Sequence, residues 1–155
     1  MIRSIGLTPF LYTVEKDREN PEAEQTKFWV IPRTVAQINA DSSIQMAQIF
    51  SKNRKGQNES YATSGKKLAQ HQADTFAECV KKIENLVVTS DAPNSFFKTY
   101  ASLFGAKDDD LEMVIHEVED PKVIRELFFV LSSDVTAEVQ QAADANSRVT
   151  PEEKN

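Results

Sequence analysis

The chain has 155 residues, of which 40% are hydrophobic and 27% are charged, and its formal net charge is −6. This size and composition predict one modest hydrophobic core, with a single domain over residues 1–147 and a flexible tail over residues 148–155. The acidic charge argues against a general phosphate-binding surface, because nucleic-acid affinity depends on clustered lysine and arginine. We therefore expect no nucleic acid among the partners.

Sorting signals and membrane segments are not apparent in the sequence. No apolar run approaches the roughly 20 residues that a membrane helix needs. Residues 1–9 lack the long apolar stretch and the cleavage pattern of a signal peptide. The single cysteine, Cys79, cannot form an internal disulfide, which fits a reducing compartment. We expect a soluble, cytoplasmic protein with no membrane partner.

The first predicted elements are two β-strands. Residues 10–14 fit a two-residue period, and residues 26–31 are rich in aromatic and β-branched side chains. The connection over residues 15–25 is highly charged, which is typical of a long solvated loop. Together these segments predict a β-hairpin over residues 8–33, in which Pro32 limits the second strand.

The pattern over residues 34–147 is helical. Thr34 is the predicted N-cap of the first helix, and residues 53–65 form a predicted mobile loop that carries two glycines. The strongest signal is an apolar stripe at helical spacing, which predicts one helix that continues to the last residue of the stripe. The stripe consists of Leu68, Phe76, Val80, Ile83 and Val87.

Two further segments extend the predicted helical region. Residues 94–104 predict a short helix that ends at Gly105. Residues 111–118 fit a helix with acids at its N-terminus, although Leu111, Met113 and Ile115 alternate and leave a strand as the alternative.

The last two predicted helices begin at N-caps. Asp120 with Pro121 predicts the start of one helix, and Asp134 predicts the start of the other. The predicted fold class is therefore α+β and mainly α-helical, an N-terminal β-hairpin followed by a bundle of about five helices.

No catalytic motif is present. A G-x-S-x-G elbow is missing, and Cys79 borders an apolar stripe, where a buried inert thiol is the more common outcome. His71, Asp74 and Glu78 have a spacing that could bind a metal on one helix face, but a solvated polar face explains them equally well. We predict no enzyme, no cofactor and no metal site, and keep a small metal-binding protein or enzyme as a minor alternative.

Two charged segments have alternative interpretations. The basic region between Lys52 and Lys67 could form a local nucleic-acid contact, but its pattern is that of a loop rather than of a recognition helix. The last residues, Thr150-Pro151-Glu152-Glu153, form a capping box followed by only two residues. This box is either a frayed terminus or the start of a helix in a longer product.

Both ends of the chain resemble the tail assembly chaperones of long-tailed bacteriophages and prophages. The N-terminal similarity lies in Thr8–Tyr12, Asp17–Pro21 and Thr26–Thr34, and the C-terminal similarity in Asp120–Leu127 and Glu152–Asn155. The resemblance implies a mainly helical chaperone in the host cytoplasm that binds and solubilises the tape measure protein and assists assembly of the tail tube protein. It also implies self-association into a homo-oligomer and a longer, frameshifted form of the same product.

A chaperone of this kind needs an apolar groove for its client. The candidate partner-binding residues are the clustered aromatics Phe96, Phe97, Tyr100, Phe104, Phe128 and Phe129. The alternative for each of them is a place in the hydrophobic core. The alternative function is a structural tail or head completion protein that stays in the virion.

Overall fold

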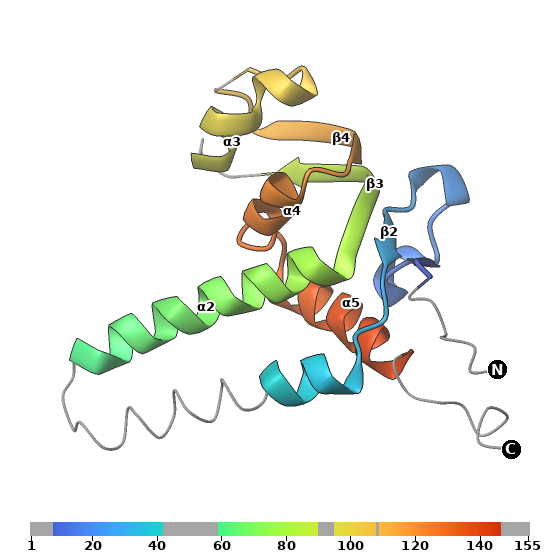
Figure 1. The fold of residues 1–155 in the computed structure, drawn as a ribbon. Coiled ribbons are helices and arrows are strands. Elements are labelled where there is room, and N and C mark those ends of the chain that lie inside the picture. Colours follow the sequence, from blue (N-terminus) through green and yellow to red (C-terminus); the bar gives the residue numbers. More distant parts are fainter. Residues whose placement is uncertain (1–7, 42–58, 90–94, 108, 147–155) are drawn as a thin grey trace, which may run out of the picture.

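The computed structural model describes residues 8–41, 59–89, 95–107 and 109–146. The fold is α+β, with a four-stranded antiparallel sheet in the order β1-β2-β3-β4 and helices packed against it (Figure 1). The prediction of a hairpin followed by a helical bundle is wrong, because two segments predicted as helical form β3 and β4. The boundary between domain and tail lies outside the described residues.

The N-terminal hairpin is confirmed. Strand β1 (Phe10–Tyr12) pairs antiparallel with β2 (Lys27–Val30), so that Phe10 lies opposite Val30. The charged connection contains two short 3-10 helices, η1 (Glu15–Asp17) and η2 (Glu22–Glu24).

The N-cap of the first helix is also confirmed. Residues 35–41 are helical, and the Gln37 N–H donates to Thr34 Oγ1 at 3.1 Å. In return, the Thr34 N–H donates to Gln37 Oε1 at 2.8 Å. The two residues therefore form a capping box that satisfies backbone donors at the helix start.

Helix α2 (Glu59–Cys79) begins inside the segment predicted as a mobile loop and ends well before Val87. Strand β3 (Val80–Thr89) follows it without a break. The predicted continuation of the helix is wrong because the three-residue spacing of Ile83 and Leu86 belongs to a bent strand. Both side chains are buried, although strict alternation would place them on opposite faces.

Strand β4 (Glu112–Val118) replaces the predicted helix over residues 111–118. It pairs antiparallel with β3, and Met113 and Ile115 point into the core while Val114 between them is exposed. The alternation of Leu111, Met113 and Ile115, which left a strand as the alternative to a helix, therefore indicated the correct element.

The remaining helices largely follow their sequence signals. The segment predicted as one helix over residues 94–104 divides into α3 (Ser95–Tyr100) and η3 (Ser102–Phe104), and Gly105 ends it with a left-handed φ of 72°. Helix α4 (Pro121–Leu127) begins at the predicted N-cap Asp120.

The start of the last helix differs from its prediction by two residues. Helix α5 (Ser133–Ala145) has Ser132 rather than Asp134 at its N-cap, and Asp134 lies in its first turn. An acidic residue there still interacts favourably with the positive end of the helix dipole.

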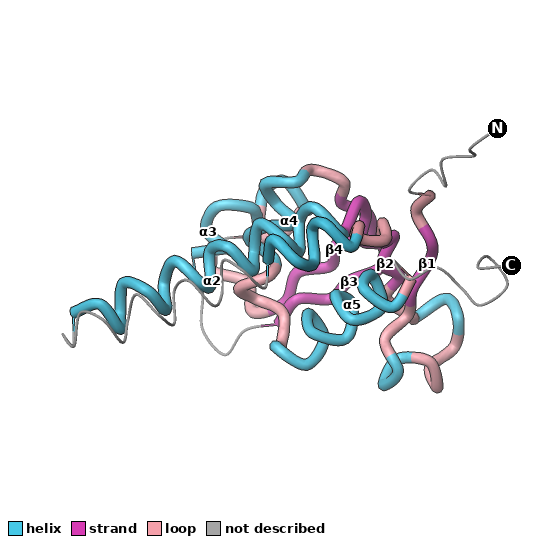
Figure 2. Tube along the Cα trace, turned by 60° about the horizontal axis from the view of Figure 1, so that its bottom comes forward, coloured by secondary structure: helices cyan, strands magenta, loops and turns pink. Residues whose placement is uncertain are grey.

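One core lies between the helices and the sheet. Helix α2 packs against α4 and α5; α2 and α4 also contact β3, and α5 contacts β2. The N-terminal part of α2 extends away from the strands (Figures 1 and 2). The largest fully buried side chains come from every layer of this arrangement. They are Phe28, Phe76, Phe97, Ile83, Met113, Ile115, Ile124, Leu127, Val30, Val80, Val123 and Val139.

Cys79 lies in this core, as its place beside the apolar stripe predicts. Its side chain is 2% exposed, and burial raises the pKa of the thiol from 9.0 to about 12. The thiol should therefore stay protonated and fail to react with a thiol reagent at pH 8 in the folded protein. In denaturant it should react at the rate of a free cysteine.

A reagent assay with and without denaturant measures this protection. Fast reaction of the folded protein would contradict the burial of Cys79. Because the folded pKa is raised, the thiol contributes stability below about pH 9, and this contribution is lost as the pH rises toward 12.

Candidate functional site

The candidate site begins at a bend in β3. Asn85, in the middle of this strand, has a φ of 57°, a left-handed conformation that asparagine tolerates better than most residues. Its side-chain Nδ2 donates to the carbonyl oxygens of Ala23 at 2.9 Å and Gln25 at 3.2 Å. The Thr26 hydroxyl donates to the Asn85 carbonyl oxygen at 3.0 Å. These bonds hold the segment before β2 against the bend.

The bend ends the pairing of β3 with β2. The last pair between the two strands is Lys27 with Glu84, and beyond the bend Leu86–Thr89 pairs with β4 alone. In Figure 1, β3 turns at this point and continues beside β4. Among the described residues, no strand lies along the other edge of Leu86–Thr89. The second part of β3 is therefore a strand with one open edge.

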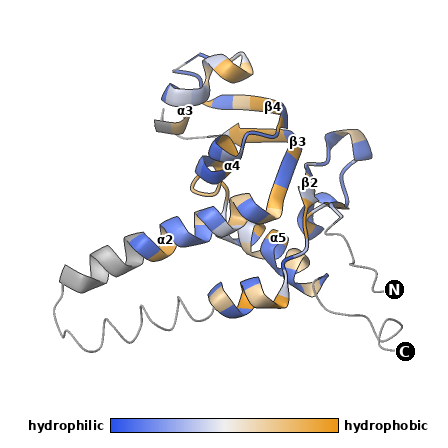
Figure 3. Ribbon diagram, viewed as in Figure 1, coloured by the Kyte–Doolittle hydropathy of each residue, from blue (hydrophilic) through white to orange (hydrophobic). Residues whose placement is uncertain are grey.

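A cavity of about 360 Å³ lies along this open edge. We call it the edge groove. Its lining residues are mostly apolar and come from β2, β3, the β1–β2 connection and the α4–α5 region. They are Val14, Lys16, Asp17, Thr26, Phe28, Leu86, Val87, Val88, Thr89, Val130, Leu131, Ser132 and Val135. Figure 3 shows that β3 is hydrophobic after the bend and mainly hydrophilic before it. Pockets of this size with apolar walls and a few polar groups are typical binding sites.

One end of the edge groove is acidic. A neighbouring hollow of about 330 Å³ shares Lys16 and Val135 with the groove and adds Glu15, Asp134 and Glu138. Lys16 Nζ lies 3.4 Å from Asp134 Oδ2, and the Glu138 carboxylate accepts from the Glu15 N–H at 3.0 Å. A hydrogen bond from the Ser132 hydroxyl, helped by Lys16, lowers the pKa of Asp134. The carboxylates around this end outnumber its one lysine.

Asp17 completes this acidic end. Its carboxylate accepts from Asn20 Nδ2 and from the Thr26 N–H, each at 2.6 Å. These bonds hold the β1–β2 connection beside the bend, so the charge of Asp17 has a fixed position at the groove.

The six aromatic residues predicted for partner binding do not form one surface. Phe96 and Phe97 are buried, while Tyr100 and Phe104 are partly buried and pack against the core. Phe96 stacks on Tyr100 with ring centroids 4.9 Å apart. These four residues lie in α3 and η3 and do not line the edge groove.

The other two predicted aromatics lie after α4. Phe128 packs against Phe76 with ring centroids 5.7 Å apart, and Phe129 meets Phe128 edge to face at 5.4 Å. Phe129 is 49% exposed and is the member of the set that is most accessible to a partner. Val130 and Leu131, which follow it, line the edge groove.

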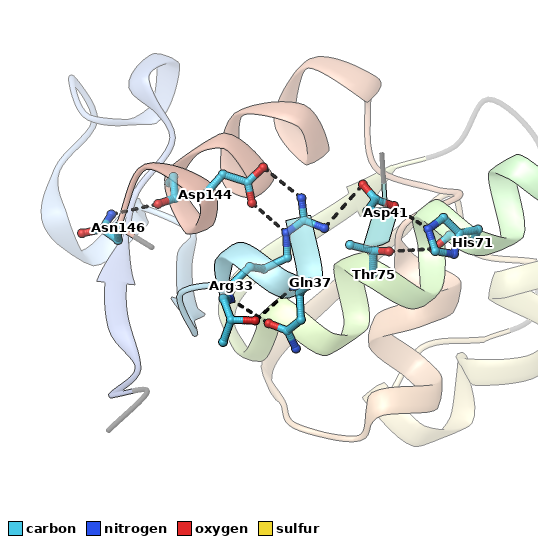
Figure 4. Close-up of polar contacts among 9 residues, drawn as sticks. Arg33, Gln37, Asp41, His71, Thr75, Asp144 and Asn146 are labelled. Carbon is cyan, nitrogen blue, oxygen red and sulfur yellow. Dashed lines mark hydrogen bonds and ion pairs between the residues drawn. The ribbon is translucent and has the colours of Figure 1, made fainter. Parts of the chain in front are cut away.

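The structure does not bring together the residues of the alternative metal site. His71 Nε2 contacts the Asp41 carboxylate (Figure 4), whereas the Asp74 carboxylate accepts from Arg125 Nε. No group of three histidine, cysteine or acidic side chains suited to a metal occurs among the residues that the structure describes. Glu78 lines a separate small cavity beside Cys79.

His71 belongs instead to a partly buried ionic cluster (Figure 4). Arg33 donates from Nε to Asp144 Oδ1 at 2.7 Å and from Nη2 to Asp144 Oδ2 at 2.9 Å. Its Nη1 lies 3.5 Å from Asp41 Oδ2, and Asp41 contacts His71. The cluster joins α5, the helical residues 35–41 and α2. We define it as the Arg33 cluster and assign it to the stability of the fold.

Parts of two predicted features lie outside the described residues. These are residues 52–58 of the basic region and the terminal capping box; residues 59–67 form the start of α2. In the described ranges, no helix has both the length and the apolar character needed to cross a bilayer.

The residues of the edge groove were not predicted from the sequence. The signal was present in Leu86-Val87-Val88-Thr89, an apolar start with three β-branched residues after an asparagine, which is typical of a strand that follows a turn. The apolar stripe at helical spacing included Val87 from this run, so the strand was predicted as the end of a helix. The partners of the run across the groove are distant in the sequence and carry no signal of their own.

Comparisons of the chain with protein families, curated proteins and solved structures find no match.

Proposed function

We propose that this chain is a non-enzymatic chaperone of bacteriophage tail assembly, which binds an apolar segment of the tape measure protein in the edge groove. The observation that carries the proposal is the groove itself, an apolar cavity along an open strand edge. The resemblance at both ends of the chain supplies the identity of the client. Assistance to the tail tube protein, self-association and a longer form of the product belong to the same proposal.

The physical chemistry of the groove fits this role. A long client with apolar stripes aggregates until tube subunits cover it, and a chaperone must cover part of this surface while it remains soluble. Val87 at the groove is 50% exposed, so apolar surface is available before a client binds. The net charge of −6 opposes aggregation of the complex.

The test is co-expression of the chain with the tape measure protein encoded near it. We expect the soluble fraction of the client to increase and the two proteins to elute together in size-exclusion chromatography. Val87→Asp should prevent both effects, because a carboxylate at the groove opposes burial of an apolar segment.

Val114→Asp is the matched control. Val114 lies opposite Val87 in the sheet and is 37% exposed, but it does not line the groove. Both variants introduce the same charge on neighbouring strands, so a loss restricted to Val87→Asp assigns the effect to the groove. A client that stays insoluble with the unmodified chain would refute the proposed function.

A further inference from the structure

We propose that the edge groove binds its partner as an added β-strand: an extended segment, with alternating apolar side chains and basic flanks, pairs with Leu86–Thr89 on the edge opposite β4. This inference rests on the proposed function for the identity of the partner, the client of the chaperone. It adds the conformation and the charge of the bound segment.

The backbone of β3 supplies the first argument. A strand with one neighbour leaves alternate N–H and C=O groups unpaired along its other edge, and such an edge accepts a further strand. Leu86–Thr89 pairs with β4 on one side, and the groove lies along the other. Four residues of strand span about 13 Å. Thr26 already binds the carbonyl of Asn85, so the open stretch begins immediately after the bend.

The walls of the groove favour one added strand. Apolar lining residues come from three elements besides β3: Phe28 from β2, Val135 from α5, and Val130 with Leu131 from the segment after α4. Side chains of an added strand alternate between two faces, as they do in β3, where Leu86 and Val88 are buried and Val87 is exposed. Apolar residues at alternate positions of the partner would therefore meet the apolar lining.

A helix is a poorer occupant than a strand. A helix satisfies its own backbone, so it would cover the open edge of β3 without bonding to it. Buried backbone groups that lack a hydrogen bond are costly, whereas an added strand pairs them. The geometry also opposes pairing of two copies, because in each copy the edge lies within a groove rather than at a protruding border of the sheet.

The acidic end of the groove favours basic residues on either side of the apolar residues of the bound segment. Asp17, Asp134 and Glu138 lie with Lys16 at this end, and the bonds of Asp17 and Glu138 hold those two carboxylates in place. Lysine or arginine beside the apolar residues of the partner would meet this acidic end. The attraction should weaken as salt is added, because the carboxylates are near solvent.

The test uses the full chain and a short synthetic peptide in which valine alternates with threonine between lysine flanks. Binding is followed by amide chemical shifts and amide hydrogen exchange. We expect shifts and slower exchange at Leu86–Thr89. Methylation of the peptide nitrogens on one edge should weaken binding about tenfold or more, because it removes the bonds between strands. Glutamate flanks should also weaken binding, whereas Val114→Asp should leave it unchanged.

Several results would overturn the proposal. Equal binding of the methylated peptide would exclude strand addition, and preferential binding of an amphipathic helical peptide with the same flanks would assign the groove to a helix. A dimer of the chain that Val87→Asp dissociates would assign the edge to a second copy. If no peptide binds while the client is still solubilised, this inference fails and the proposed function stands. If the peptide binds but the client stays insoluble, the proposed function fails and strand addition in the groove stands.

Discussion

Phe97→Ala is expected to lower the free energy of unfolding by about 3–5 kcal/mol, whereas Phe129→Ala should lower it by no more than about 1.5 kcal/mol. The two residues belong to the same predicted set, but Phe97 is fully buried and Phe129 is 49% exposed. Truncation of Phe97 leaves a cavity in the core. Truncation of Phe129 removes one edge-to-face contact with Phe128, and such contacts contribute about 0.5–1.5 kcal/mol.

Urea denaturation of the two variants beside the unmodified chain measures this difference. An equal loss of stability in both would contradict the burial that separates them. Phe129→Ala also serves in the co-expression assay, because Phe129 precedes the groove residues Val130 and Leu131. A defect in solubilisation by a fully stable Phe129→Ala protein would extend the client surface to this ring.

Local signals predicted the elements whose ends depend on neighbouring residues. The N-cap Thr34, the N-cap Asp120 with Pro121, and the left-handed Gly105 act within one turn of the chain. Such interactions can be predicted from sequence because they do not require the rest of the fold. The alternating N-terminal strands were predicted for the same reason.

The sheet could not be predicted as easily. In β3 the bend at Asn85 places Ile83 and Leu86, three residues apart, in the same core, and this spacing resembles one face of a helix. To predict a strand from apolar periodicity, the side chains must alternate regularly, and a residue in the left-handed conformation interrupts this alternation. The bend itself depends on bonds from Asn85 to Ala23 and Gln25, about 60 residues away in the sequence.

The edge groove could not be predicted from sequence for a related reason. Its residues Val14, Phe28, Val88 and Val130 come from separate segments, and each alone is an ordinary apolar residue. Clustered aromatics such as Phe96 and Phe97 gave a stronger signal for a binding surface, yet they fill the core. Burial depends on tertiary packing, so hydrophobicity by itself does not separate core from site.

Arg33→Met should lower the free energy of unfolding at pH 7 by about 3 kcal/mol, the lower end of the cost for breaking a buried ion pair. The Arg33 side chain is 6% exposed and Asp41 is 11% exposed, so both charges have little access to water. Asp144 is 34% exposed, and solvent there reduces the cost. Methionine fills much of the same space but leaves Asp144 and Asp41 without the guanidinium.

Two further variants separate charge from geometry. Arg33→Lys keeps the positive charge but cannot reproduce the two parallel bonds to Asp144, so its loss should lie between those of the unmodified chain and Arg33→Met. Asp144→Asn should cost less than Arg33→Met, because Arg33 retains Asp41. Equal stability of Arg33→Met and the unmodified chain would contradict a stabilising role of the cluster.

The pH dependence of Arg33→Met provides an independent test of the cluster. The hydrogen bond to Asp144 raises the pKa of the Arg33 guanidinium, so its stabilisation is present below the pKa of an unfolded arginine, which includes the range from about pH 6 to about pH 9. The difference in unfolding free energy between the two proteins should therefore stay constant over this range. A difference that grows or shrinks within it would contradict the assignment of the lost stability to the Arg33 guanidinium.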